Sequence, residues 1–183
     1  GRIDKTALIV HDCVAAGIHQ PDAVLAGIAE AEAYAALVQR DDEENQRLYY
    51  DLLIGVTEFF RDPEAYAALT EPVRASLCSE NSTDIRVWVA GCATGEEVYS
   101  IAMLLDEARR ASGWAGNIRL FATDIHTDAL KFASAGVYPR EALQNLSAER
   151  RERYFVAEPG GCRVAEALRE MVVFATHNLV ADA

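Results

Sequence analysis

Residues 86–100 constrain the fold more than any other part of the chain, because an apolar strand, a turn of small residues and an acid-opened helix follow one another there. The segment reads RVWVAGCATGEEVYS. Gly91 and Gly95 let the backbone turn sharply where the strand ends and leave room that a larger side chain would fill. This order predicts the first strand, turn and helix of a Rossmann-like sheet, which binds its ligand at the carboxyl edge of the strands.

Glu96 and Glu97 indicate which ligand this turn would accept. A phosphate-binding turn offers bare backbone N–H groups at the positive end of a helix dipole, and two carboxylates placed there repel a pyrophosphate. They suit a ligand with a positive charge and hydroxyls but no phosphate, such as S-adenosylmethionine (SAM). The alternative is a tight connection that binds nothing, because a lone glycine-rich turn is a weak signal.

Asp124 strengthens the case for a nucleoside ligand. It ends the next predicted strand, residues 118–124, where an acid commonly accepts hydrogen bonds from ribose hydroxyls. A helix predicted from Glu96 to about Ala111 fills the long interval between the two strands. The apolar run 171–176 predicts a last strand, apolar enough to be central in a parallel sheet.

The first third of the chain has the periodicity of helices. Helices are predicted over residues 3–16, from Pro21 to about Val38 and over 41–54, and Asp41 and Glu44 have the spacing of a capping box. Another is predicted over 63–77, with Pro72 kinking or breaking it. After Asp124, helices are predicted to begin at caps Thr127 and Ser147, and residues 159–161 form a turn. The fold class is therefore α/β: an N-terminal helical domain with its linker helix over residues 1–80, then an incomplete Rossmann-like domain over 81–183.

Composition excludes several other classes of protein. The 183 residues carry a net charge of −12, which argues against a nucleic-acid partner, and no apolar run approaches the length of about 20 residues that spans a membrane. We expect a cytoplasmic protein with no membrane insertion. Its four cysteines and four histidines lack the spacing of a metal site, so no metal is expected and the thiols are expected to be free.

The motifs, taken in order, resemble those of the CheR-type chemoreceptor protein-glutamate methyltransferases. The resemblance extends over about residues 52–180. It is carried by the Thr-x-Phe-Phe-Arg segment at 57–61, the Gly-x-x-x-Gly-Glu-Glu-x-Tyr-Ser segment at 91–100, Ala-Thr-Asp-Ile at 122–125 and His-Asn-Leu at 177–179. It implies a class I methyltransferase that uses SAM, releases S-adenosylhomocysteine and acts on glutamate side chains of chemoreceptor helices or another signalling protein.

The resemblance also implies roles for individual residues. Gly91 belongs to the cofactor turn, and the other cofactor-binding positions are Thr57, Arg61, Glu96, Asp124, Asn178 and Leu179. Arg61 would lie near the methionine carboxylate and the methyl-transfer centre, which makes it the expected catalytic residue. Glu96 would meet the ammonium and Asp124 the ribose, while Asn178 and Leu179 would line the adenine side. From the residues alone, Arg61 could instead form a surface ion pair with Asp62, although the apolar run before it favours an interdomain position, and Asn178 could be a turn residue.

Several features depart from the family pattern. Gly55 stands where many members have Asn, and His126 stands where an acid is frequent. The strands that follow the Asn-Leu pair in members have no counterpart here, so we expect a fragment truncated before the C-terminal part of the catalytic domain. The small β-subdomain by which some members grip a receptor tail is also expected to be absent. An unpaired sheet edge would favour a homodimer or strand exchange.

Three functions therefore remain open. The first is a SAM-dependent methyltransferase, the second a non-catalytic SAM-binding or signalling-interaction module, and the third a nicotinamide-dependent oxidoreductase. Glu96 and Glu97 argue against the third. Methyl transfer to a carboxylate that is already ionised needs alignment more than acid-base catalysis, so the lack of a Ser-His or His-Asp arrangement is consistent with the first.

Overall fold

The computed structural model describes residues 31–41, 44–45, 48, 57–77, 84–179 and 181, and it divides the chain into two compact units, Gly1–Ile54 and Gly55–Ala183. In the first unit, helix α3 (Ala31–Val38) buries Val38, and the Tyr34 hydroxyl donates a hydrogen bond to Glu44 over 2.9 Å. The Asp41 side chain accepts from the Glu44 N–H, as the capping-box spacing predicts. The helices expected over 3–16 and from Pro21 to residue 30 lie outside the described residues, as does Gly55.

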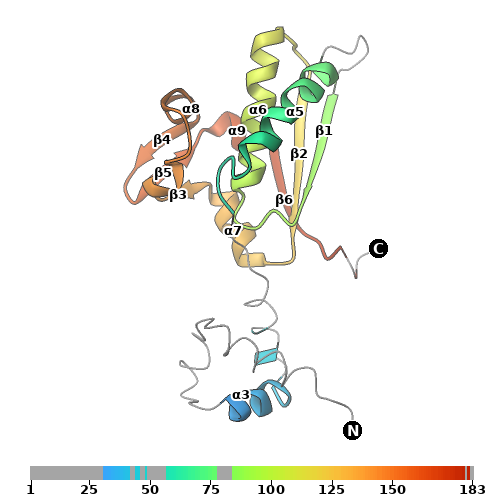
Figure 1. Ribbon diagram of the computed structural model, residues 1–183, viewed down its shortest axis with the longest axis vertical. Helices are drawn as coiled ribbons and strands as arrows, with labels where there is room; N and C mark the ends of the chain where they lie inside the picture. Colours follow the sequence, from blue (N-terminus) through green and yellow to red (C-terminus); the bar gives the residue numbers. More distant parts are fainter. Residues whose placement is uncertain are drawn as a thin grey trace. The chain divides into compact units, whose positions relative to one another are not determined.

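The second unit is built on a parallel sheet with the strand order β1-β2-β6. Its principal elements in chain order are α5 (Pro63–Leu77), β1 (Asp84–Ala90), α6 (Glu96–Ser112), β2 (Asn117–Asp124), α7 (Thr127–Ala135) and β6 (Val172–Thr176). Helices α6 and α7 pack against the strands, and α5 packs on α6 (Figure 1). This confirms the α/β class. The run expected to be a central strand is instead an edge strand among the described residues, since β6 pairs only with β2.

The two faces of this sheet differ in what covers them. Leu120 and Ala122 of β2 point to one face and have no exposed surface, because α6 and α7 pack there. The opposite face carries Trp88, Phe121 and Val173, which are register partners across the three strands and are 57%, 44% and 46% exposed. Parallel sheets are normally covered on both faces. The described part of the chain therefore covers one face only.

Helix α5 has the bounds that its sequence predicts. It runs without a break from Pro63 to Leu77 and contains Pro72, so of the predicted kink or break the break is wrong, while the kink stays a prediction. Pro72 lies on the exposed side of the helix, where water can solvate the carbonyl that loses its N–H donor. The structure groups α5 with the second unit because α5 packs on α6. The division into an N-terminal helical domain with its linker helix over 1–80 and a Rossmann-like domain over 81–183 stays a prediction.

A second, antiparallel sheet lies between α7 and β6 in the sequence. Its strand order is β3-β5-β4, with β3 (Val137–Tyr138), β4 (Phe155–Glu158) and β5 (Gly161–Val164), and it is accompanied by the short helices η1 (Arg140–Leu143), α8 (Ala148–Tyr154) and α9 (Glu166–Arg169). The expectation that a small β-subdomain is absent is therefore wrong. The Pro159-Gly160 turn was recognised, but the four-residue strands on either side of it are too short to show an alternating pattern.

Charged and polar groups fasten α8 to α6. Asp106, 2% exposed, accepts hydrogen bonds from Arg109, Arg110 and the Tyr154 hydroxyl at 2.5, 2.6 and 3.1 Å. Burial raises the pKa of the Asp106 carboxyl, but the hydrogen bonds from these three partners outweigh burial and lower the pKa overall. Asp106 is therefore ionised and fully bonded in the folded chain.

We expect Asp106→Asn to lower the free energy of unfolding by about 1.5–3 kcal/mol at neutral pH, because hydrogen bonds to a charged acceptor are lost. The folded-state pKa is depressed, so the contribution is present above the unfolded value near 3.8 and is lost as pH falls through the lowered folded value. Urea unfolding of both chains between pH 7 and pH 2.5 measures this. A stability difference that does not shrink on acidification would contradict the assignment.

Candidate functional site

The turn between β1 and α6 has the backbone shape that its glycines predict. Gly91 and Gly95 lie at φ +69° and +93°, and Ala93 between them also has a positive φ of +44°. The Cys92 N–H donates to the Thr123 carbonyl over 3.0 Å, which joins the turn to the end of the neighbouring strand. The turn therefore lies at the carboxyl edge of the sheet, where open α/β sheets bind ligands.

Asp124 holds this turn in place. One carboxylate oxygen accepts from the Ala93 N–H over 2.7 Å and the other accepts from the His126 N–H over 2.9 Å, while the residue is 8% exposed. Each carboxylate oxygen has a further lone pair, so Asp124 can still accept hydrogen bonds from a ligand. The predicted ribose acceptor thus shapes the turn, a role that the sequence did not indicate.

Glu96 is the buried acid at the start of α6. It is 8% exposed, and one of its carboxylate oxygens accepts from the Thr94 hydroxyl over 2.6 Å. Burial raises the pKa of Glu96, while the hydrogen bonds from Thr94 and from its own backbone oppose the rise. A buried carboxylate at this position is best stabilised by a cation. The neighbouring Glu97 is exposed.

The Tyr138 hydroxyl supports the turn from the antiparallel sheet. It donates to the Thr94 carbonyl over 2.7 Å, and burial raises its pKa, so it stays a neutral donor. The Tyr138 ring, 1% exposed, also packs edge-on against Phe59 with 4.9 Å between ring centroids. The small sheet therefore contacts both the turn and the segment that precedes α5.

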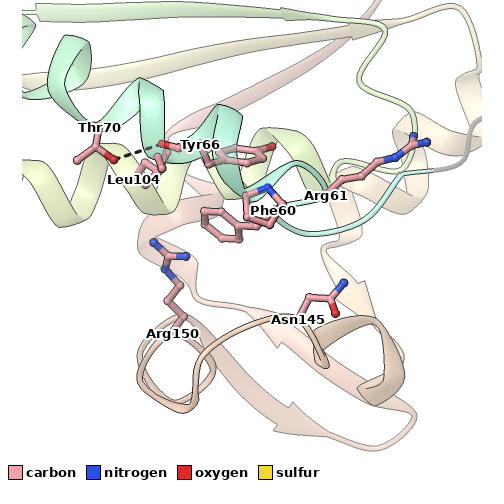
Figure 2. Close-up of a pocket in the computed structure, with 9 residues that line it drawn as sticks. Phe60, Arg61, Tyr66, Thr70, Leu104, Asn145 and Arg150 are labelled. Atoms are coloured by element: carbon pink, nitrogen blue, oxygen red, sulfur yellow. Dashed lines mark hydrogen bonds between the residues drawn. The ribbon is translucent and has the colours of Figure 1, made fainter.

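Residues 57–61 are attached to the same region through their backbone. The Phe60 N–H donates to the hydroxyl of Ser100 on α6 over 3.0 Å, and the Phe59 ring is fully buried. The next residue, Arg61, is exposed, and its side chain extends away from Tyr66 and Arg150 (Figure 2). Thr57 is half-buried.

Asn178 and Leu179 follow β6 at the same edge of the sheet. The His177 N–H donates to the Asp124 carbonyl over 3.0 Å, so this segment starts beside the acid of β2. The Asn178 side-chain oxygen accepts from the Ala181 N–H, as a turn residue would, and Leu179 is 55% exposed. The sheet edge thus brings together Gly91, Glu96, Asp124 and the start of the 177–179 segment.

A cavity of about 540 Å³ lies beside residues 60–61 (Figure 2). Its lining residues are Phe60, Arg61, Pro63, Tyr66, Ala67, Thr70, Leu104, Asn145 and Arg150. Neither Glu96 nor Asp124 lines it, and the Arg150 guanidinium is paired with Glu107 and lies 3.9 Å from the centre of the Phe60 ring. The carboxylate-bearing turn, not this cavity, has the chemistry expected of the ligand site.

Residues 55–183 match the family model described as CheR methyltransferase, SAM binding domain. The chain belongs to this family. SAM is accordingly the cofactor of the domain, which confirms the ligand class inferred from Glu96 and Glu97.

Several curated proteins are similar to this chain. The chain is 36% identical over 157 residues to an uncharacterised 104.1 kDa protein of Rhodobacter capsulatus, covering 85% of this chain and 16% of that protein. It is 38% identical over 145 residues to a putative methyltransferase, Cher3, of Pseudomonas putida, covering 75% and 50%. It is 34% identical over 161 residues to the chemotaxis protein methyltransferase of Escherichia coli, covering 85% and 54%. The chain thus spans about half the length of the two named methyltransferases and a smaller part of the first relative.

The residues at the turn fit the cofactor. Nothing lies within 4 Å of the position that a Cβ on Gly91 would take, so the backbone is open to a close approach there. Glu96 offers a carboxylate to an ammonium, and Asp124 offers acceptors to hydroxyls. Burial and the carboxylate of Asp124 raise the pKa of the Cys92 thiol to about 12, so this cysteine is protonated at neutral pH and is not a nucleophile.

Sequence reasoning missed two residues that organise the site, Ser100 and Tyr138. Ser100 ends the segment that resembles the family, which was the available signal. Tyr138 had no such signal, because its contacts with Thr94 and Phe59 join residues 44 or more positions apart.

The described residues contain no group of three or more His, Cys, Asp or Glu side chains arranged to hold a metal, and none of their helices has the length and apolarity needed to cross a membrane.

Alanine substitutions at the two glycines should separate ligand binding from folding. Gly91→Ala adds a Cβ into open space, so we expect only the backbone strain of about 1–2 kcal/mol but a loss of SAM binding. Gly95→Ala would bring its Cβ within 2.8 Å of the Ala133 Cβ and 3.0 Å of the Tyr138 hydroxyl, so we expect a larger loss of stability. Thermal unfolding and SAM titration measure both; equal stability losses would argue against this geometry.

Proposed function

We propose that the full-length protein is a SAM-dependent protein-glutamate O-methyltransferase acting on chemoreceptor helices, and that this chain supplies the cofactor-binding part. The observation that carries the proposal is the hydrogen-bonded turn of residues 93–94, which contacts both Asp124 and Glu96 at 2.7 and 2.6 Å. Two buried carboxylates on one turn suit a cationic nucleoside and repel a dinucleotide.

The proposed roles follow the chemistry of each side chain. Glu96 binds the ammonium of the methionine part, and Asp124 accepts from the ribose hydroxyls. Gly91 gives the backbone room for the ligand. Arg61 and Thr57 bind on the methionine side, where the guanidinium pairs with a carboxylate, and Asn178 and Leu179 lie along the adenine. Arg61 is exposed, which leaves it accessible to an incoming substrate as well.

The reaction asks for position rather than acid-base catalysis. Bound SAM supplies an electrophilic methyl group to an oxygen of the substrate glutamate. A free glutamate, with a pKa of about 4.3, is already ionised at neutral pH, so no side chain has to remove a proton. The residues of this site instead hold the donor in line and exclude water, and such positioning can lower a barrier by about 7–11 kcal/mol.

Calorimetric titration of the chain with SAM and with NAD tests the cofactor proposal. We expect binding of SAM only, and we expect Glu96→Gln to weaken it about 10- to 100-fold, since a charge-assisted hydrogen bond to the ammonium is lost. Protonation of Glu96 should also weaken SAM binding on acidification. Because burial raises the Glu96 pKa, this loss of affinity should begin at a higher pH than it would for a glutamate with the usual pKa of 4.5. Glu97→Gln, on an exposed neighbour, is the matched control.

Activity has to be measured on the full-length protein with receptor helices. Base-labile methyl esters on glutamate would support the proposal. SAM binding without ester formation would instead select the alternative, a non-catalytic SAM-binding or signalling-interaction module. Binding of NAD in preference to SAM would overturn the proposal for the site itself.

The open edge and face of the parallel sheet suggest self-association of the chain. In the described region β1 pairs only with β2, and Trp88, Phe121 and Val173 are exposed side by side on one face. We expect a concentration-dependent homodimer or strand exchange in sedimentation, and we expect Trp88→Lys to weaken it by placing a charge on the apolar row. A strict monomer at a protein concentration of about 100 µM, or about 2 mg/ml, would contradict this expectation.

A further inference from the structure

The hydroxyl of Ser100 joins the two parts of the site that come from different regions of the sequence. Ser100 has no exposed surface; its hydroxyl accepts from the Phe60 N–H over 3.0 Å and donates to the Glu96 carbonyl over 2.7 Å. A serine hydroxyl has one proton and two lone pairs, so it can make both bonds at once. One side chain thus ties the peptide before Arg61 to the peptide of Glu96.

The segment that Ser100 holds has an unusual conformation. Phe60 lies at φ +53°, a left-handed backbone that an aromatic residue adopts only when its surroundings impose it. Its ring packs against Tyr66 with 4.8 Å between centroids and under the Arg150 guanidinium, so the ring is fixed on one side of the backbone. The direction in which Arg61 leaves the chain depends on this conformation.

The contacts of the Phe60 ring do not by themselves fix the backbone. A ring can keep its neighbours while the peptide rotates, whereas the bond from the Phe60 N–H to Ser100 sets the orientation of the peptide itself. Since Ser100 follows Glu96 by one helical turn, the same hydroxyl also fixes the distance between this peptide and the start of α6.

We infer that Ser100 is a positioning residue for the cofactor: it sets the register of the segment 57–61 on the first turn of α6, so that Arg61 and Glu96 contact the two charged ends of one methionine group. The inference rests on the proposed function, because it assigns a purpose to a contact between two elements that both bind SAM. Ser100 itself is fully buried, so it acts through the peptides of Phe60 and Glu96.

The test compares Ser100→Ala with Ser100→Thr and Tyr99→Phe in the 183-residue chain. Ser100→Ala removes the acceptor of the Phe60 N–H, and Ser100→Thr restores a hydroxyl. Tyr99→Phe is the matched control, because it removes another fully buried hydroxyl of α6, whose bond to the Ala133 carbonyl lies away from residues 57–61. SAM affinity is measured by calorimetry, amide exchange at Phe60 by NMR, and stability by urea unfolding.

We expect Ser100→Ala to weaken SAM binding about tenfold and to speed exchange of the Phe60 amide, while Ser100→Thr and Tyr99→Phe bind within about twofold of the unsubstituted chain. Unchanged affinity in Ser100→Ala would overturn the inference, as would an equal loss of affinity in Tyr99→Phe at similar stability. A Ser100→Ala chain that does not fold beside a folded Tyr99→Phe chain would make Ser100 a folding residue only. Failure of the unsubstituted chain to bind SAM would overturn the proposed function as well.

Discussion

The carboxylate of Asp124 is the constraint on which the rest of the site depends. It accepts hydrogen bonds from the N–H groups of Ala93 and His126, and so joins the turn after β1 to the residues that follow β2. Both bonds are charge-assisted and shielded from water, which makes them stronger than ordinary backbone contacts. The positive φ angles of residues 91, 93 and 95 are maintained against this fixed point. The ligand edge is therefore pre-formed rather than assembled around a ligand.

The second half of the site is positioned by packing from outside the parallel sheet. The antiparallel sheet places Tyr138 against Phe59 and against the Thr94 carbonyl, and α8 places Arg150 over the Phe60 ring. A side-chain amide, that of Asn145, donates to Glu58 over 2.8 Å from the same insertion. Residues 137–164 thus contact the segment that carries Thr57 and Arg61 from one side, and Ser100 binds the same segment from α6.

The local features of this chain were predictable, and the long-range ones were not. The periodicity and the caps predicted α5 and α6, and predicted β1 and β2 to within about a residue at each end, because these elements are set by neighbouring residues. The acids at 96 and 124 can be proposed from the sequence because their chemistry is visible in the turn itself, and their roles stay predictions. The antiparallel sheet was missed since its strands have two to four residues, and the place of β6 at an edge depends on partners far along the chain.

The row of Trp88, Phe121 and Val173 has a practical consequence for anyone who measures this chain. Dyes whose fluorescence rises on apolar surface will bind the folded state. A dye-based melting curve therefore starts from a high fluorescence and shows a smaller change in fluorescence on unfolding. Of the two tryptophans in the chain, Trp88 lies on that row and Trp114 packs partly buried against the core. The emission of the two together therefore mixes a signal from what covers the sheet with a signal from the state of the core.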